Sequence, residues 1–283
     1  MAELLETLAC YIPTLVVRRL IREPSPPTTP KEDRLPASML FADLSGFTVL
    51  AEQLAQQGPE GAEELSDFLN SKFDRLIKII TALGGDVVTF AGDALLALWP
   101  ALDDDLDVMT HRAAQCGLDL QTLFNNERLS ASLHLDVRIG IGAGDVDIIH
   151  VGGVYERWLW LVTGNPVSQL IHVEQQAQPG QVVLSPEAWE LVKHACEGEP
   201  LLEQPACAQV SETGQMELAR GESESEYLNH PAATPPSILL HALQHFPPFI
   251  TPIPLDLHPS MSMETALRCY IPDVVLTRLA AGQ

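Results

Sequence analysis

Two aspartates, Asp43 and Asp93, each stand beside an apolar run and constrain this sequence more than any other feature. Asp43 follows Met39-Leu-Phe-Ala and precedes Ser-Gly, a pattern that predicts a buried strand leading directly into a helix. Asp93 lies in Phe90-Ala-Gly-Asp-Ala-Leu-Leu-Ala, where two β-prone runs flank Ala-Gly-Asp and indicate a hairpin with Asp93 at its tip. Either aspartate alone could be an N-cap or a turn residue. The two motifs together favour one functional site.

Two carboxylates side by side at strand ends repel each other and are costly to bury, so such a pair usually recruits a cation. Hard oxygen ligands of this kind suit Mg²⁺ or Mn²⁺. The backbone amides of Gly46, Phe47 and Thr48 would open the helix after Asp43 and offer a phosphate site. The sequence therefore predicts phosphoryl chemistry. Without metal, we expect that neutralising either Asp43 or Asp93 relieves repulsion.

Three segments of the chain resemble the class III adenylyl/guanylyl cyclase catalytic domain. They are Phe41-Ala-Asp-Leu-Ser-Gly-Phe-Thr48, the Phe90 to Ala97 element, and Val137-Arg-Ile-Gly-Ile-Gly-Ala-Gly144. The likeness is greatest to the first catalytic domain of the soluble, bicarbonate-responsive adenylyl cyclases, and it covers roughly residues 36–192. It implies an α+β, ferredoxin-like fold with a β-α-α-β-β-α-β core, in which helices cover an antiparallel-rich sheet and its other face dimerises.

The resemblance also implies an activity, the conversion of ATP to 3′,5′-cyclic AMP and pyrophosphate. Asp43 and Asp93, with the backbone of Leu44, would then hold two Mg²⁺ or Mn²⁺ ions. Arg138 would hold the nucleotide phosphates together with Gly46, Phe47 and Thr48. An arginine that merely pairs with a surface carboxylate remains an alternative for Arg138. ATP is preferred to GTP only through the resemblance.

The chain departs from the family pattern where the base and the transition state are bound. The family's Asn and Arg on the helix after Gly164-Asn165 fall at Ser168 and His172. The base-reading lysine is absent from residues 86–91, and the base-reading acidic residue is absent from residues 158–163. We therefore expect this domain to supply the metal and phosphate half of a site that a second cyclase domain completes, in cis or in trans. A catalytically silent regulatory module, which dimerises or senses a ligand, is the alternative.

The net charge limits the choice of partners. The 283 residues include 16 basic and 38 acidic side chains, giving a formal charge of −22, which argues against nucleic acid or an anionic membrane as the main partner. Glu3, Glu6 and Pro13 make a signal peptide or a membrane span at the N-terminus implausible. The five cysteines show no metal-binding spacing, so we expect reduced thiols in a cytoplasmic protein.

A short repeat organises the two ends of the chain. Cys10-Tyr-Ile-Pro13 recurs as Cys269-Tyr-Ile-Pro272, and each copy precedes an amphipathic segment, so we interpret the second copy as the start of another cyclase unit. Chance similarity of two amphipathic helices is the alternative. The expected division is 1–35 as an amphipathic helix and Pro-rich linker, 36–196 as the catalytic domain, 197–260 as an acidic, Pro-rich connector, and 261–283 as the repeated helix.

Periodicity predicts the remaining elements of the catalytic domain. Helices are expected over 46–57 and from Pro59 to Gly84-Gly85, the second with an apolar stripe that would lie in the core. Strands are expected over 135–142, 146–151 and 156–162, followed by a helix to about 176. The stripe consists of Leu65, Phe68, Leu69, Phe73, Leu76, Ile77, Ile80 and Leu83.

Overall fold

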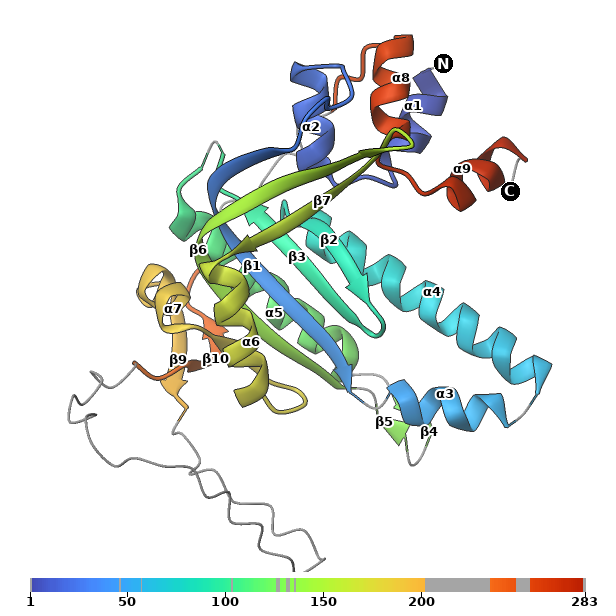
Figure 1. Cartoon of the computed structure of the whole chain (residues 1–283). Coiled ribbons are helices and arrows are strands. Elements are labelled where there is room, and N and C mark those ends of the chain that lie inside the picture. The colour runs from blue at the N-terminus through green and yellow to red at the C-terminus, as the bar shows by residue number, and fades with distance from the viewer. Residues whose placement is uncertain are drawn as a thin grey trace, which may run out of the picture.

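An eight-stranded, mostly antiparallel sheet forms the centre of the fold (Figure 1). This computed structural model describes residues 2–45, 47–56, 58–102, 104–125, 128–130, 133–134, 136–201, 235–247 and 255–281. The strand order is β2-β3-β1-β6-β8-β10-β9, with β7 paired to β6. The strands are β1 (Lys31–Ser45), β2 (Asp86–Ala91), β3 (Ala94–Pro100), β6 (Asp136–Val154), β7 (Arg157–Gly164), β8 (Val182–Leu184), β9 (Cys196–Pro200) and β10 (Ile238–Leu243), while β4 (Arg128–Ser130) and β5 (Leu133–His134) form a separate pair.

Helices lie on both faces of this sheet. The main core joins one sheet face to α3 (Phe47–Ala55), α4 (Pro59–Ala82), α5 (Leu106–Asn125) and α7 (Pro186–Val192). The helix α6 (Asn165–Gln176) packs on the opposite face, in front of the sheet in Figure 1. The α+β fold expected from the sequence is confirmed. In the part of the chain that the structure describes, no helix combines the length and apolar character needed to cross a bilayer.

Strand β1 begins well before the apolar run that predicted it. Its first residues, starting at Lys31, belong to the segment expected to be a Pro-rich linker. They form a strand because they pair with the second half of β6, from Lys31 opposite His150 to Pro36 opposite Asp145. Pairing with β3 starts only after Pro36. The proline therefore sits where one edge of the strand has no ladder neighbour, which suits a residue without an N–H donor.

One further expectation about strands was wrong, and the segment expected to be a connector adds strands to the sheet. The strands expected over 135–142 and 146–151 are one continuous strand, β6, because its first half pairs with β1 and β8 and its second half with both β1 and β7. The expected connector contains β9 in part and β10, which extend the sheet beyond β8. Residues 202–234 of that connector lie outside the described residues.

The long helix α4 places its fully buried apolar side chains in its C-terminal half, while Leu65 and Phe68 of its first half pack against the core and stay partly exposed. Leu76 and Ile80 are fully buried, whereas Ile77, which was expected in the apolar stripe, is 36% exposed. The first turns of α4 extend beyond the sheet (Figure 1). The helix ends at Ala82, just before Gly84-Gly85. A Cβ on Gly85 would lie 2.6 Å from the Trp99 ring, so glycine lets the chain turn tightly against the buried indole.

Glycines in β6 allow α6 to approach the sheet closely. A Cβ on Gly140 would come within 2.7 Å of the Val173 side chain, and one on Gly142 within 2.9 Å of the Pro166 carbonyl oxygen. The side chain of Gln169 on α6 then forms two hydrogen bonds with the Ala143 backbone. Its Oε1 accepts from the N–H at 2.9 Å, and its Nε2 donates to the carbonyl oxygen at 3.1 Å. The close approach fixes the position of α6 on this face.

The two copies of the repeat have the same structure and pack together. The first forms α1 (Ala2–Ala9) and α2 (Thr14–Arg22), and the second forms α8 (Met261–Arg268) and α9 (Asp273–Ala280). Their apolar faces share one cluster, which brings the two ends of the chain together (Figure 1). Its buried members are Leu5, Leu8, Ile12, Val16, Val17, Leu20, Met263, Ala266, Leu267 and Ile271.

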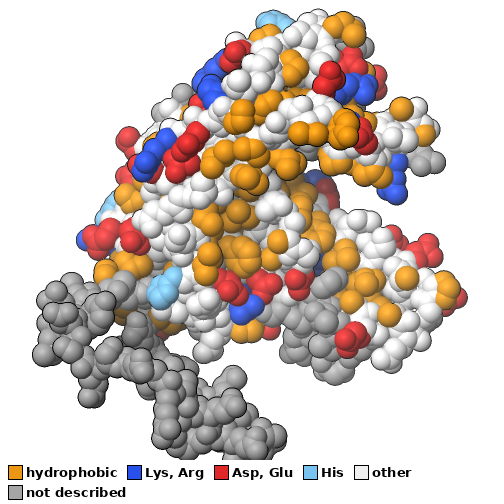
Figure 2. Space-filling model, viewed as in Figure 1, with side chains coloured by type: hydrophobic (Ala, Val, Ile, Leu, Met, Phe, Trp, Pro, Cys, Tyr) orange, Lys and Arg blue, Asp and Glu red, His pale blue; other side chains and the backbone are white. Residues whose placement is uncertain are grey.

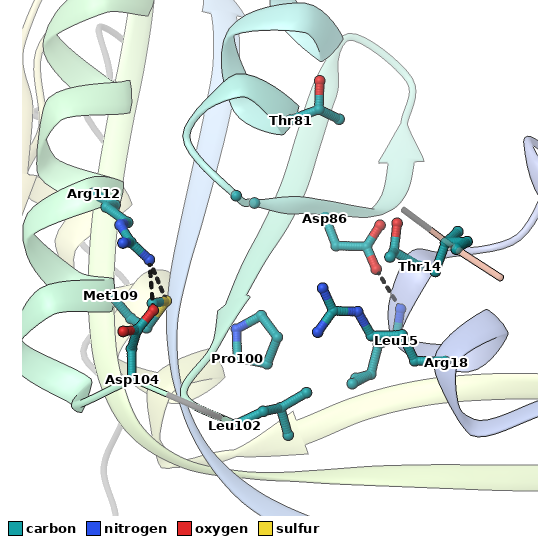
Figure 3. Close-up of a pocket in the computed structure, with 13 residues that line it drawn as sticks. Thr14, Leu15, Arg18, Thr81, Asp86, Pro100, Leu102, Asp104, Met109 and Arg112 are labelled. Atoms are coloured by element: carbon teal, nitrogen blue, oxygen red, sulfur yellow. Dashed lines mark hydrogen bonds and ion pairs between the residues drawn. The ribbon is translucent and has the colours of Figure 1, made fainter. Parts of the chain in front are cut away.

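Asp86, the first residue of β2, attaches α2 to the catalytic sheet. Its Oδ2 accepts a hydrogen bond of 2.8 Å from the Leu15 backbone N–H at the start of α2 (Figure 3). Burial raises the pKa of the Asp86 carboxyl, and the bonds from the α2 backbone and Thr14 oppose this rise only in part. The carboxyl thus acts as an N-terminal cap for a helix from a distant part of the chain.

We expect Asp86→Asn to raise the thermal midpoint at pH 7. The amide oxygen can still accept the Leu15 bond, while the buried charge is removed. The pKa of Asp86 is higher in the folded protein than in the unfolded chain. Below about pH 4 the carboxyl is protonated in both the folded and the unfolded protein, and its contribution to stability is greatest there. This contribution is lost as the pH rises through the folded-state pKa. The difference between variant and wild type should therefore shrink towards pH 4 in thermal melts.

Asp86→Ala is the matched control for this experiment. It removes the charge and also the acceptor, so it should melt below Asp86→Asn at every pH, by the equivalent of about 1–2 kcal/mol. A lower midpoint for Asp86→Asn than for the wild type at pH 7 would contradict this account of α2 docking.

Candidate active site

The central strand β1 brings the predicted site residues together. Asp43 lies opposite Ala94 of β3 on one side and opposite Arg138 of β6 on the other. Asp93 directly precedes Ala94 in the two-residue turn between β2 and β3, which Gly92 enters with a φ of 69°. The expected hairpin, with Asp93 at its tip, is confirmed. Two carboxylates that are 50 positions apart in sequence thus meet at one end of the sheet.

Arg138 forms an ion pair with Asp43. Its Nε donates to Asp43 Oδ2 at 3.1 Å, and its Nη2 contacts the same oxygen. Nη2 also lies 3.1 Å from Glu174 Oε1. The Asp43 hydrogen bond raises the pKa of the guanidinium, and the charges of Asp43, Glu174 and Asp93 add to this effect. Arg138 therefore stands among three carboxylates as their shared cation.

Sequence reasoning did not identify Glu174. It lies on α6, on the side of the helix that faces β6, because the close packing at Gly140 brings this turn against the strand. The only sequence signal was an acidic residue within a helix expected to pack on the sheet. That signal does not indicate which basic residue it contacts.

The repulsion expected between Asp43 and Asp93 is offset in this structure by an arginine that the expectation did not include. Asp43 is 17% exposed and its charge is already balanced by Arg138. Asp43→Asn is therefore not expected to stabilise the metal-free chain, since it removes an ion pair as well as a repulsion. The alternative interpretation of Arg138, as a partner of a carboxylate, describes its contacts here.

The remaining predicted residues are partly described. Leu44 is buried. It follows the last residue of β1 that pairs with β3 and still pairs with Val137 of β6. Phe47 and Thr48 form the first turn of α3, just after Asp43 in the chain. Gly46 lies outside the described residues. The order of a strand followed closely by a helix N-terminus is thus the one predicted, and the roles of these residues remain predictions.

The donor set at this end of the sheet fits a hard divalent cation. Asp43 and Asp93 supply carboxylate oxygens, which Mg²⁺ and Mn²⁺ prefer. In the described part of the chain, no group of three or more His, Cys, Asp or Glu side chains is arranged to hold a metal. Two protein carboxylates therefore suit an ion whose other ligands are backbone, water or substrate oxygens. Such an ion would compete with Arg138 for Asp43.

Comparisons with known proteins identify the family. The Adenylate and Guanylate cyclase catalytic domain family matches residues 30–227. The chain belongs to this family. As a class III cyclase domain, it is related to proteins that generally use divalent metal ions, bind nucleotides and dimerise.

The curated relatives are longer than this chain. Adenylate cyclase type 10 of rabbit (Oryctolagus cuniculus) is 32% identical over 186 residues, which are 65% of this chain and 11% of that protein, and the human protein gives the same figures. Adenylate cyclase 1 of Rhizobium meliloti is 27% identical over 172 residues, covering 59% of this chain and 24% of that protein. The chain therefore spans a small part of the length of these relatives.

Solved structures share the fold. The adenylyl cyclase CyaB from P. aeruginosa superposes with a TM-score of 0.55 at 20% identity, covering 74% of this chain and 95% of that one. The guanylate cyclase domain of RhGC from Catenaria anguillulae, in complex with GTP, gives a TM-score of 0.54 at 19% identity, covering 75% and 99%. At these identities the likeness concerns the fold alone.

Ser168 and His172 occupy the outer surface of α6 in this cyclase domain. Both are exposed, and His172 Nε2 lies 3.2 Å from the Gln176 amide nitrogen. The same helix contributes Glu174 to the carboxylate cluster from its inner side. The helix α6 therefore has one side turned to this domain's own aspartates and another available to a partner.

Replacing Arg138 should expose the competition between arginine and metal. In EDTA we expect Arg138→Gln to lose about 1–2 kcal/mol of unfolding free energy, because Asp43, Asp93 and Glu174 lose their common cation. Adding Mn²⁺ should then stabilise the variant more than the wild type, since the ion no longer competes with a guanidinium. Chemical denaturation in EDTA and in MnCl₂ measures both effects.

Arg34→Gln is the control for this prediction. Arg34 also pairs with carboxylates of β6, Asp145 at 3.2 Å and Asp147 at 3.8 Å, but its side chain is 67% exposed. Such surface ion pairs contribute little to the free energy of unfolding. We therefore expect Arg34→Gln to lower it by less than about 0.5 kcal/mol and to leave the stabilisation by Mn²⁺ unchanged. Equal Mn²⁺ responses of Arg138→Gln and the wild type would contradict the assignment of the metal to Asp43.

Proposed function

We propose that this domain takes part in the metal-dependent conversion of ATP to 3′,5′-cyclic AMP and pyrophosphate, and that it supplies the metal and phosphate half of the site. The observation that carries this proposal is the placement of Asp43 between Ala94 and Arg138, with Asp93 in the adjoining turn. The family match and the name of the type 10 relatives, adenylate cyclase, support this choice of reaction. Four free cysteines among the described residues agree with a cytoplasmic setting.

In the proposed reaction the ribose 3′-oxygen attacks the α-phosphorus, and its proton passes to water. The bond between the α-phosphorus and the oxygen that bridges to the β-phosphate breaks and releases pyrophosphate. Two Mg²⁺ or Mn²⁺ ions would lower the pKa of the 3′-hydroxyl and neutralise charge on the phosphates. Asp43 and Asp93, with the Leu44 carbonyl, would hold these ions. The backbone amides that begin α3, with Gly46 just before it, would donate to phosphate oxygens.

Arg138 would change partners during this cycle. Without nucleotide its guanidinium neutralises Asp43 and Glu174. When metal binds Asp43, the guanidinium would be released towards the triphosphate, where its forked donors match phosphate oxygens. Glu174 would keep it oriented, because this second contact does not involve a metal-binding carboxylate.

The other half of the site would come from a second cyclase domain, in cis or in trans. Large apolar side chains are exposed on the β6–β7 hairpin and on α6, namely Val154, Tyr155, Leu159, Leu161 and Ile171, with exposed fractions of 52–93%. Figure 2 shows hydrophobic side chains gathered across the middle of the visible face. Exposed apolar groups of this kind are typical of interaction surfaces. They support docking of a partner domain along the β6–β7 hairpin and the outer side of α6, the helix that also carries Glu174.

A silent regulatory module is the second candidate, and a specific observation favours it. Ser168 and His172 stand where the resemblance places the residues that stabilise the transition state. A symmetric pair of these chains would therefore contain two metal halves and no transition-state half. The two candidates differ in whether the aspartates of this chain bind metal and nucleotide productively.

We expect the chain alone to show little or no turnover of ATP with Mn²⁺, because the transition-state residues are missing. The double variant Ser168→Asn, His172→Arg should gain measurable cyclic AMP formation if this chain pairs with itself, since each copy would then complete its partner's site. Chromatographic detection of cyclic AMP and pyrophosphate tests both statements. Robust turnover by the wild-type chain would refute the half-site proposal.

Asp43→Asn and Asp93→Asn should each remove the Mn²⁺-dependent part of ATP binding, by at least tenfold in affinity, because each removes a charged metal ligand. Calorimetric titration with ATP in MnCl₂ and in EDTA isolates that part. Glu32→Gln is the matched control, since Glu32 is an exposed acidic residue near the other end of the same strand. If Glu32→Gln weakened binding as strongly, general acidity rather than a metal site would explain the result.

A further inference from the structure

A cavity of about 340 Å³ lies between α2, the start of β1 and the second half of β6. Five of the chain's 16 lysine and arginine residues line it, against two acidic residues, although the whole chain carries a charge of −22. Its lining is therefore opposite in sign to the molecule as a whole. The charged lining residues are Arg18, Arg19, Arg22, Lys31 and Arg34, with Glu23 and Asp33.

The arginines of α2 differ from the cations of β1 in their partners. Lys31 Nζ lies 3.5 Å from an Asp33 carboxylate oxygen, and Arg34 pairs with the carboxylates of β6 described above. In contrast, none of the three arginines on α2 takes part in an ion pair with another described residue. Arg18 does act on the Asp86 carboxyl through its charge, and the Arg19 side chain is hydrogen-bonded to Tyr270. Neither contact is an ion pair, so the positive charge of these arginines at the cavity is not paired with a described carboxylate.

Arg19 carries the most specific signal. Its Nη1 is buried and has no hydrogen-bond partner within the described chain. Buried donors are rarely left without an acceptor, because water can no longer satisfy them. On the neighbouring wall, burial and the charge of Arg19 lower the pKa of His150 to about 4, so its ring is neutral and adds no positive charge to the cavity. The two acidic residues of the lining, Glu23 and Asp33, form no ion pair with Arg19 among the described residues. The His150 ring nitrogen Nδ1 is already 2.8 Å from the Tyr270 hydroxyl.

We propose that this cavity binds a polyphosphate anion, either inorganic polyphosphate or the phosphate chain of a nucleotide, at a second site remote from Asp43 and Asp93. Arginine forks match phosphate oxygens, and the volume exceeds what a single phosphate group would fill. Asp33 at the cavity and Asp43 are ten residues apart on the same strand, which is roughly 30 Å at about 3.3 Å per residue.

Binding at this site would connect three parts of the chain. Arg19 and Arg22 belong to α2, Lys31 and Arg34 to β1, and His150 to β6. An anion held between them would fasten α2 to the sheet next to the Asp86 cap. Arg18 also borders a neighbouring cavity of about 310 Å³, into which its side chain points beside Asp86 (Figure 3). Variants at Arg19 and Arg22 therefore test the polyphosphate cavity more selectively than variants at Arg18.

Calorimetric titration with sodium tripolyphosphate, on the full chain in EDTA at fixed ionic strength, tests this proposal. EDTA removes the metal that the catalytic aspartates would need for nucleotide. We expect saturable binding and a rise in thermal midpoint, and the double variant Arg19→Gln, Arg22→Gln should weaken binding at least tenfold. Arg22→Gln alone changes an exposed side chain and should weaken binding several-fold, even if the double variant folds poorly. Parallel titrations with ATP and adenosine identify the source of the phosphate chain.

Two controls separate binding in this cavity from binding elsewhere on the chain. Arg278 of α9 is the repeat counterpart of Arg19 and is exposed outside the cavity, so Arg278→Gln should leave tripolyphosphate affinity unchanged. Asp43→Asn should also leave it unchanged. Absence of tripolyphosphate binding by the wild type would overturn the proposal. An affinity loss in Arg278→Gln as large as that in the Arg19→Gln, Arg22→Gln variant would also overturn it, because it would show non-specific attraction of the anion to positive charge. Loss of binding in Asp43→Asn would assign the anion to the catalytic site instead.

Discussion

The pairing of β1 on both of its edges is the constraint on which the rest of the site depends. One register with β3 sets Asp43 beside the turn that carries Asp93, and the other sets it opposite Arg138. Side chains alternate between the faces of a strand, so a shift of one residue would move Asp43 into the helix-covered core. The burial of Leu40, Ala42 and Leu44 on that side opposes such a shift. The packing of these three residues in the core therefore keeps Asp43 on the opposite face of the sheet, next to Arg138.

Arg138 places a positive charge among three carboxylates in a strongly acidic chain. Its contacts to Asp43 and Glu174 supply the positive charge that a divalent ion would otherwise supply. A partly buried ion pair of this kind contributes little net stability because of its desolvation cost. It does hold the aspartate in place and offset part of the negative charge of the cluster. We interpret the arginine as a substitute cation in the resting domain.

The sequence predicted the features that depend on local order and missed those that depend on distant partners. Asp43, Asp93 and the Gly92 turn follow from short motifs, and the structure brings both aspartates to one end of the sheet. The early start of β1 and the strand β10 depend on neighbours more than 50 residues away. Glu174 was missed for the same reason. Periodicity identified α4 but not that the apolar residues of its first half are only partly buried.

The contact between α1 and α8 joins segments that are about as far apart in sequence as this chain allows. The two terminal segments are therefore held together by this contact, while the sheet lies in the part of the chain between them, and both ends lie on one side of the molecule (Figure 1). A pulling force applied at the two ends would therefore act on the contacts between α1 and α8 before it acted on β1 or β6. Asp43, Asp93 and Arg138 would then stay unstrained until the contacts between α1 and α8 broke.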